Sequence, residues 1–169
     1  MRLIGLDPGL RHTGWGLIEV EGVRLRFLAC GTVDSDDGAP LPTRLAMLYD
    51  GLASVLRDAC PAGAAVEETV VNRNAGSSLK LGQARGVVLL AVAHAGVAVE
   101  EYGAKRIKRA VTGTGAADKQ QVAAMVRILL GHAAVGGADA TDALAAAICH
   151  AHHLGTAQRL AAAHRAVSA

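Results

Sequence analysis

The sequence predicts one α/β domain built on a mixed β-sheet, and three observations carry this prediction. First, the chain has 169 residues, 51% of them hydrophobic and 19% charged, which suits a single domain with a real core. Second, short apolar segments typical of strands alternate with longer segments of helical spacing. Third, the first three strand-like segments are joined by short connections, which predicts antiparallel neighbours in an otherwise parallel sheet.

Five short apolar segments account for the expected sheet. The second and third alternate between apolar and polar residues and are separated by a short turn at Gly22, which indicates an antiparallel meander. The fourth and fifth are each preceded by a longer helical segment, as expected of strands in a parallel arrangement. The five segments are residues 2–6, 13–20, 23–33, 63–67 and 96–102.

Helical spacing separates these strands and follows the last one. Residues 41 to about 60 place a stripe of leucines on one face, and residues 76–94 are also expected to be helical. A basic turn or short helix follows residue 103, and Asp118 is expected to cap a helix that ends near Leu130. The final helix is expected to begin near Thr141. We expect the domain to comprise residues 1–155, with residues 156–169 as a basic tail that extends this helix or frays.

Composition narrows the class of protein. No apolar segment is long enough to span a bilayer, and no leader precedes the first strand, so we expect a cytoplasmic protein with no membrane partner. The three cysteines are far apart, which favours reduced thiols over a disulfide framework. Residues 69–138 carry nine basic and three acidic side chains, whereas residues 1–68 carry six and ten. The basic segment is either a polyanion-binding surface or a solvated face, and charge alone favours neither.

Four acids stand in small, apolar surroundings. Asp7 and Glu67 end strand-like segments, and functional sites in α/β sheets gather at the carboxyl ends of strands. Asp139 and Asp142 are three residues apart, a spacing that can place both on one face of a helix. Converging carboxylates would raise one another's pKa values, and a divalent cation would relieve the repulsion. An all-oxygen set favours Mg²⁺ or Mn²⁺ over zinc, and two such ions could promote phosphodiester hydrolysis.

Each acid by itself also has a simpler interpretation. Asp139 and Asp142 would be favoured by the helix dipole, and Asp7 could be a turn residue. Adjacent strand residues face opposite ways, so the sequence leaves open whether Glu67 or Glu68 faces the site. Three histidines, at positions 150, 152 and 153, raise the possibility of a metal site through His150 and His153. No carboxylate stands beside them, and the adjacent Cys149 is expected to serve as small buried packing, which together favour a polar or DNA-adjacent helix end.

Four segments in this order resemble one known family: "GLDPGLRHTGWG", "AVEETVVNRNAGSSLKLGQARGV", "AADKQQV" and "ADATDALAAAICH". Together they closely resemble the RuvC-type Holliday junction resolvases over about residues 2–153. The resemblance implies a ribonuclease H-like nuclease domain in residues 1–155. It also implies a homodimeric bacterial endonuclease that resolves four-way DNA junctions by paired symmetric nicks, leaving a 5′-phosphate and a 3′-hydroxyl. The implied partner is the RuvA–RuvB branch-migration complex.

The resemblance also implies roles for individual residues. The metal-binding and catalytic acids would be Asp7, Glu67, Asp139 and Asp142, holding Mg²⁺, or Mn²⁺ in its place, with two ions per site. Lys119 would be catalytic, since a lysine beside the scissile phosphate can neutralise developing charge. The implied DNA contacts are Val70, Arg73, Lys80, Arg85, Lys105, Lys108 and Lys119, with Arg106 and Arg109 as further basic candidates. For each basic residue the alternative is a solvated surface charge, and for Arg85 a structural ion pair.

One position departs from the family pattern. Many members carry an aromatic residue three positions after the strand glutamate, where it can stack at the junction centre. This chain has Val70 there, which can wedge by apolar contact but cannot stack on a base. Opening of the junction would then depend on apolar contact or on a neighbour such as Arg73.

Two other functions are compatible with parts of the sequence. "LDPGLRHTG" is similar to the first phosphate-binding loop of actin-like kinases and ATPases, but those proteins close two related domains over ATP and 169 residues are too few. A catalytically silent module that binds branched DNA would keep the basic segment and lose the acids, whereas all four acids are present.

Overall fold

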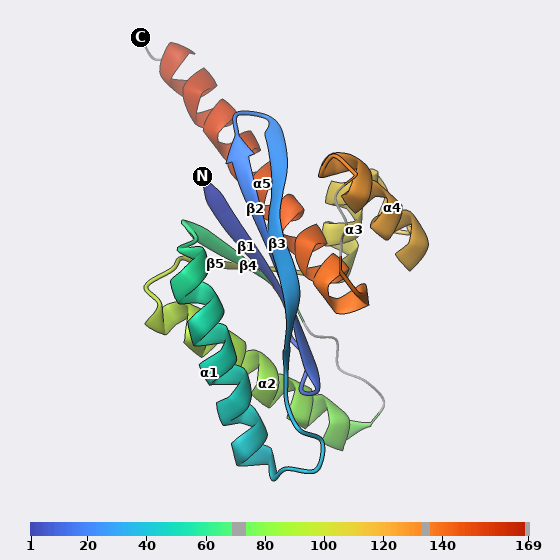
Figure 1. Ribbon diagram of the computed structural model, residues 1–169. Coiled ribbons are helices and arrows are strands. Elements are labelled where there is room, and N and C mark those ends of the chain that lie inside the picture. The colour runs from blue at the N-terminus through green and yellow to red at the C-terminus, as the bar shows by residue number, and fades with distance from the viewer. Residues whose placement is uncertain (69–73, 133–135, 168–169) are drawn as a thin grey trace.

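The structure is a computed structural model, and it describes residues 1–68, 74–132 and 136–167 (Figure 1). The described residues form five strands and five helices. In chain order these are β1 (Arg2–Asp7), β2 (His12–Glu21), β3 (Arg24–Asp34), α1 (Leu41–Ala59), β4 (Gly63–Glu67), α2 (Ala75–His94), β5 (Val99–Tyr102), α3 (Ala104–Thr112), α4 (Lys119–Leu129) and α5 (Ala138–Val167).

The sheet has the predicted mixed character. Its strand order is β3-β2-β1-β4-β5. The meander pairs β1 with β2 and β2 with β3 in antiparallel fashion, while β4 lies parallel to β1 and β5 parallel to β4. The two parallel pairs are reached through helical crossovers, as parallel connections require. The carboxyl ends of β1, β4 and β5 therefore meet at one edge of the sheet.

Helices cover both faces of the sheet. Helices α1 and α2 pack on one face, and α5 lies across the other with α3 and α4 beside it (Figure 1). Side chains on a strand alternate between faces. In β1, Ile4 and Leu6 join the core under α1 and α2, whereas Leu3 joins the core under α5. Continued to the strand end, this alternation turns Asp7 toward the α5 face.

The same alternation operates in β4. Ala64 and Val66 belong to the core under α1 and α2, and Ala65 belongs to the core under α5. Glu67 follows two residues after Ala65 and so shares its face. Leu6 and Val66 are paired in register across the parallel ladder, which brings the ends of the two strands side by side.

Glycines allow α5 to lie directly on the sheet. A Cβ atom added to Gly5 would stand 1.9 Å from the carbonyl oxygen of Ala143, and one added to Gly16 would stand 2.5 Å from Leu144. No side chain fits at such distances, so glycine at these strand positions marks a close backbone approach. This contact sets the height of the N-terminal end of α5 above β1 and β2.

Helix α5 begins earlier than expected and, at its other end, extends into the tail, one of the two outcomes expected there. It begins at Ala138, three residues before the expected start, and Thr141 closes its first turn on the carbonyl of Gly137. Both Asp139 and Asp142 therefore lie within the opening turns. At the other end the helix passes through Gly155, so the proposed boundary between residues 155 and 156 falls inside a helix. Among the described residues, no helix is long and apolar enough to cross a membrane.

Candidate active site

A cavity of about 320 Å³ opens at the carboxyl ends of β1 and β4. It combines three carboxylates and two lysines with an apolar floor. The side chains come from β1, β4, α3, α4 and α5, so no local segment of the chain could form the cavity alone. Its lining residues are Asp7, Glu67, Ala104, Ile107, Lys108, Lys119, Val122, Asp142 and Ala145.

The acids repel one another across this cavity. Burial, together with the nearby charges of Glu67, Asp142 and Asp139, raises the pKa of Asp7 from its ordinary value of 3.8 to about 7. Burial also raises the pKa of Glu67, with Asp142 as the next contribution. Asp139 does not line the cavity, although its charge acts on Asp7. The structure thus brings all four sequence-predicted acids into one electrostatic cluster, with three of them facing the cavity.

Two lysines partly offset this negative charge. The Lys119 ammonium lies 3.4 Å from a carboxylate oxygen of Asp142 and lowers the pKa values of both Asp7 and Glu67. Lys119 is the first residue of α4, whose capping box between Asp118 and Gln121 fixes the start of the helix. Lys108 enters from α3 and lowers the pKa of Glu67. The side chain of Lys119 is 80% exposed, so it remains free to approach a ligand in the cavity.

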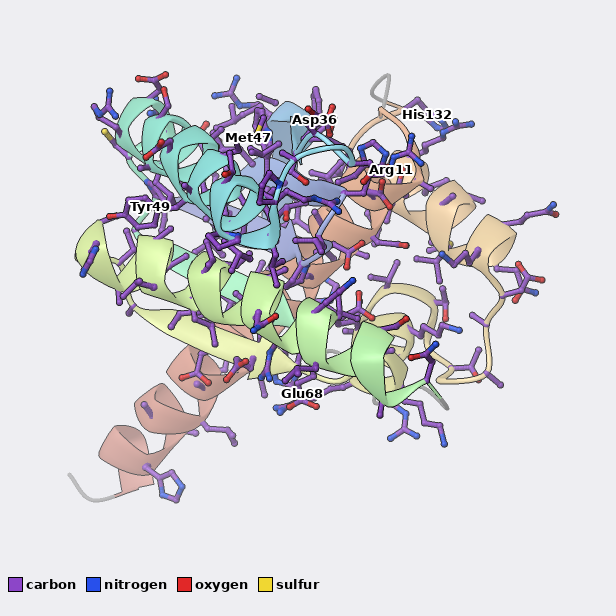
Figure 2. All side chains as sticks on the ribbon, turned by 90° about the horizontal axis from the view of Figure 1, so that it is seen from below. Arg11, Asp36, Met47, Tyr49, Glu68 and His132 are labelled. Atoms are coloured by element: carbon purple, nitrogen blue, oxygen red, sulfur yellow. The ribbon has the colours of Figure 1, made fainter. Side chains whose placement is uncertain are left out.

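The structure also distinguishes the two neighbouring glutamates. Glu67 lines the cavity, whereas Glu68 is exposed and lies beside Gly103 at the start of α3. Figure 2 labels Glu68 at the outside of the sheet edge. The period of two along β4 therefore directs Glu67, and not Glu68, toward the other acids.

The donor set of the cavity fits a hydrated magnesium or manganese ion. Among the described residues, no three His, Cys, Asp or Glu side chains are arranged to hold a metal ion by themselves. Mg²⁺ commonly binds through one or two carboxylates and keeps several waters, so it does not need a complete protein cage. Burial and mutual repulsion leave the pKa of Asp7 at about 7, and a cation would relieve that repulsion.

The predicted DNA contacts have different surroundings. Val70 and Arg73 lie outside the described residues. Lys80 on α2 and Lys105 on α3 are exposed, and Lys108 faces the cavity. Arg85 is 29% exposed and forms an ion pair with Glu101, while its Nε atom is buried without a hydrogen-bond partner. Its guanidinium is therefore held by the fold, and a DNA contact by Arg85 stays a prediction.

The histidines near the end of the domain belong to a packing cluster that the sequence did not reveal. His150 is hydrogen-bonded to the Tyr102 hydroxyl at 2.8 Å, and His153 accepts from the Nε of Arg106 at 3.0 Å. The histidines lie inside α5, which continues to Val167, and His150 is buried. Sequence reasoning had expected a polar or DNA-adjacent helix end here instead. It missed Tyr102 and Arg106 as the partners, because they are far away in the chain and carry no motif.

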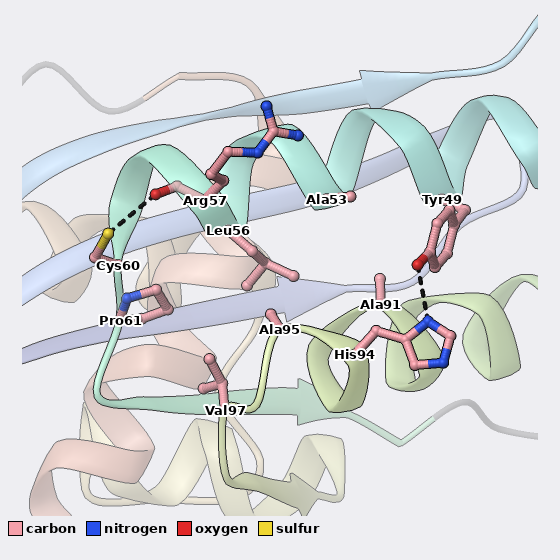
Figure 3. A pocket seen from close by; sticks show the side chains of 10 residues that line it. All are labelled: Tyr49, Ala53, Leu56, Arg57, Cys60, Pro61, Ala91, His94, Ala95 and Val97. Carbon is pink, nitrogen blue, oxygen red and sulfur yellow. Dashed lines mark hydrogen bonds between the residues drawn. The ribbon is translucent and has the colours of Figure 1, made fainter.

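A larger cavity of about 550 Å³ lies between α1 and α2 (Figure 3). Its polar groups include the Tyr49 hydroxyl, which is hydrogen-bonded to His94 at 2.8 Å, and the thiol of Cys60. Cys60 is an exposed free thiol. The described residues that line this cavity include no acid, so it lacks the donors that a hard cation needs.

Comparison with known proteins identifies the family of this chain. Residues 3–150 match the family described as crossover junction endodeoxyribonuclease RuvC. The protein of that name from Acidiphilium cryptum is 62% identical over 162 residues, which cover 96% of this chain and 97% of the relative. The one from Gluconacetobacter diazotrophicus is 58% identical over 165 residues, 98% of each chain.

Solved structures give the same result. The structure of Thermus thermophilus RuvC superposes with a TM-score of 0.84 at 36% identity, over 93% of this chain and 97% of that one. T. thermophilus RuvC in complex with a Holliday junction substrate superposes with a TM-score of 0.87 at 36% identity, over 93% and 96%. The expected ribonuclease H-like fold is confirmed. With a family match over most of its length and the fold of solved members, this chain belongs to the RuvC family of crossover junction endodeoxyribonucleases.

Proposed function

We propose that this protein is a metal-dependent Holliday junction resolvase that acts in DNA recombination and repair. The observation that carries the proposal is the convergence of three carboxylates and two lysines on one cavity in a chain of this family. A relative at 36% identity is described in complex with a Holliday junction substrate, which supports the same substrate class for this chain.

The acids of the cavity would hold the metal and the lysines would act on the phosphate. Asp7, Glu67 and Asp142 offer their oxygens to Mg²⁺, or to Mn²⁺, with Asp139 adding negative charge from the side. A pair of such ions would supply an activated water and stabilise the leaving 3′ oxygen. Lys119, which pairs with Asp142, would neutralise charge that builds on the phosphate as the bond breaks. Hydrolysis would leave a 5′-phosphate and a 3′-hydroxyl.

Exposed basic residues near the cavity would hold the DNA backbone. Lys105 lies on the same short helix as Lys108, and Lys80 lies on α2. Contacts of this kind position a duplex and depend on salt, but they do not read its sequence. Val70 and Arg73 remain predicted contacts at the junction, with Val70 acting as an apolar wedge.

A homodimer would present two such cavities to the two-fold symmetry of a four-way junction. Helix α2 offers a surface for self-association. Leu79 and Leu90 are 67% and 48% exposed, and open space lies over Gly82 and Gly86 between them. These four positions recur every three or four residues and so share one face of the helix. An apolar stripe with small central residues lets two helices approach closely.

We also propose a place of action in the cytoplasm, beside the RuvA–RuvB branch-migration complex. Family membership supports both statements.

Cleavage of a labelled four-way junction beside a linear duplex of the same sequence tests the proposed function. The expected result is paired symmetric nicks in the junction alone, present with Mg²⁺, absent with EDTA and absent in Asp7→Asn. Equal cutting of both substrates would keep a nuclease but remove the junction assignment. Tight junction binding without cleavage in Mg²⁺ or Mn²⁺ would instead indicate a silent binding module.

A further inference from the structure

Helix α3 carries Lys108 into the cavity, yet few interactions within the helix itself stabilise it. It has nine residues, and Gly103 at its N-cap has no side chain to cap it. Only Ile107 and Val111 are buried along its length. Helices this short depend on tertiary contacts for their stability and orientation. We therefore expect the contacts between α3 and its neighbours to determine the direction of the Lys108 side chain.

Arg106, two residues before Lys108, makes the first set of contacts that hold α3 to its neighbours. Its Nε donates to the Nε2 of His153 on α5 at 3.0 Å. Its guanidinium carbon lies 5.0 Å from the ring centroid of Tyr102, within cation–π range. The Tyr102 and His153 rings are stacked, with centroids 5.2 Å apart and planes 12° apart. Burial, with Arg106 next in effect, lowers the pKa of His153, which keeps its ring neutral at pH 7 and able to accept this bond.

His152, the neighbour of His153, makes a second contact between α5 and α3. Its Nδ1 donates to the carbonyl of Ala110 at 3.0 Å, in the second half of α3. Deeper in the core, His150 is hydrogen-bonded to the hydroxyl of Tyr102 at 2.8 Å. Three histidines in the segment 150–153 thus join α5 to α3 and to the end of β5.

Both elements joined to α3 carry or adjoin acids of the cavity. Helix α5 bears Asp142, and Tyr102 is paired in register with Glu67 across β4 and β5. Lys108 in turn lowers the pKa of Glu67, so its charge reaches that carboxylate. These contacts therefore join the helix that bears Lys108 to the elements that bear Asp142 and adjoin Glu67.

We propose that Arg106 and His153 are positioning residues, which hold α3 so that Lys108 faces the cavity. This inference rests on the proposed function, in which Lys108 acts on the DNA phosphate. It also gives Arg106 a different role from the DNA contact that its charge suggests. A positioning residue changes the cleavage rate of bound junction, whereas a backbone contact changes the affinity for the junction.

A double-mutant cycle on single-turnover cleavage, with enzyme in excess over junction, tests the proposal. His153→Ala and Arg106→Ala are expected to slow cleavage roughly 10- to 100-fold, because small misplacements of a catalytic group cost this much. The dissociation constant for the junction, measured in Ca²⁺, is expected to stay within about threefold. In the Lys108→Ala background, neither substitution is expected to slow cleavage further. His153→Gln, whose amide oxygen can accept from Arg106, is expected to recover part of the rate.

Arg127→Ala removes an exposed arginine from the neighbouring helix α4 and serves as the matched control. Additive losses in the double variants would overturn the positioning role, as would wild-type cleavage by His153→Ala. Weaker binding by Arg106→Ala with an unchanged rate would make Arg106 a DNA contact. If Lys108→Ala itself cleaves like wild type, the proposed role of Lys108 fails, and this single variant shows it before the cycle is run. Circular dichroism checks folding, and Arg106→Lys with His153→Gln replace any alanine variant that unfolds.

Discussion

The carbonyl oxygen of Asp139 lies 2.1 Å from the point that a Cβ atom on Gly14 would occupy. Gly14 is also the residue paired with Asp7 across β1 and β2. One missing side chain therefore lets the start of α5 approach β2 closely, directly beside the end of β1 that carries Asp7. This close approach is what allows acids that are more than 130 residues apart in the chain to share one cluster.

Gly14→Ala is expected to push the start of α5 off the sheet and to lower both stability and cleavage. The clash is with backbone atoms, so no side-chain rotation relieves it, and the loss of stability is expected to be about 1–3 kcal/mol. Urea unfolding and junction cleavage measure the two effects. Gly155→Ala is the control, because Gly155 lies in α5 with open space around it. This variant should gain up to about 1 kcal/mol in the free energy of unfolding. Wild-type cleavage by Gly14→Ala would contradict the account.

Asp7→Asn is expected to stabilise the metal-free protein while abolishing cleavage. The pKa of Asp7 is about 7 when folded, above its ordinary value of 3.8, so the folded protein binds more protons between these values. The stability that this provides is complete below pH 3.8 and is lost as the pH rises through 7. At pH 8 in EDTA the neutral variant should therefore be more stable by about 2–4 kcal/mol.

Two further conditions check this explanation. The difference in free energy of unfolding between Asp7→Asn and wild type should become smaller at pH 5, where the carboxyl of Asp7 is protonated in the folded protein. It should also narrow in Mg²⁺, because an ion that binds only the folded wild type stabilises it. A gap independent of both pH and Mg²⁺ would show that Asp7 is not held among repelling acids.

Lys119→Ala is expected to slow cleavage without affecting stability. Its ion pair with Asp142 spans 3.4 Å and its side chain is 80% exposed, so the pair contributes at most about 0.5 kcal/mol. In the reaction the same ammonium would face a developing negative charge, where such groups contribute about 100-fold or more in rate. Thermal unfolding and single-turnover cleavage measure the two effects. A large fall in the melting temperature with unchanged cleavage would make Lys119 a structural residue.

Leu79→Glu and Leu90→Glu are expected to break a dimer formed through α2. Each places a charge in the apolar stripe that two copies of the helix would bury. Light scattering after size-exclusion chromatography would then report a monomer. Junction cleavage would give single nicks in place of paired symmetric ones. Leu160→Glu alters an equally exposed leucine on α5 and should leave the dimer intact. A dimer that survives both α2 substitutions would place the interface on another surface.

Much of this protein could be predicted from local sequence alone. Alternating apolar residues indicated the strands, the segment around Asp118 indicated a capped helix, and the short turns before β3 indicated a mixed sheet. The four acids could be singled out because a carboxylate at the end of an apolar strand, or in an alanine-rich helix, needs a specific reason to be there.

The tertiary structure decided which of these side chains meet. The period of two turned Asp7 and Glu67 toward α5 and left Glu68 outside, but only strand register placed the two ends side by side. The close approach of α5 to the glycines of β1 and β2 became clear only in the fold.

The roles of several charged residues were likewise decided by contacts that have no sequence signal. Arg85 is paired with Glu101, and Arg106 lies between Tyr102 and His153, although both arginines belong to a basic segment that suggested DNA. A charge in the sequence shows only that a partner or solvent is needed. Whether that partner is a carboxylate, an aromatic ring or a phosphate depends on which distant residues the fold brings within a few ångströms, and local sequence does not encode that distance.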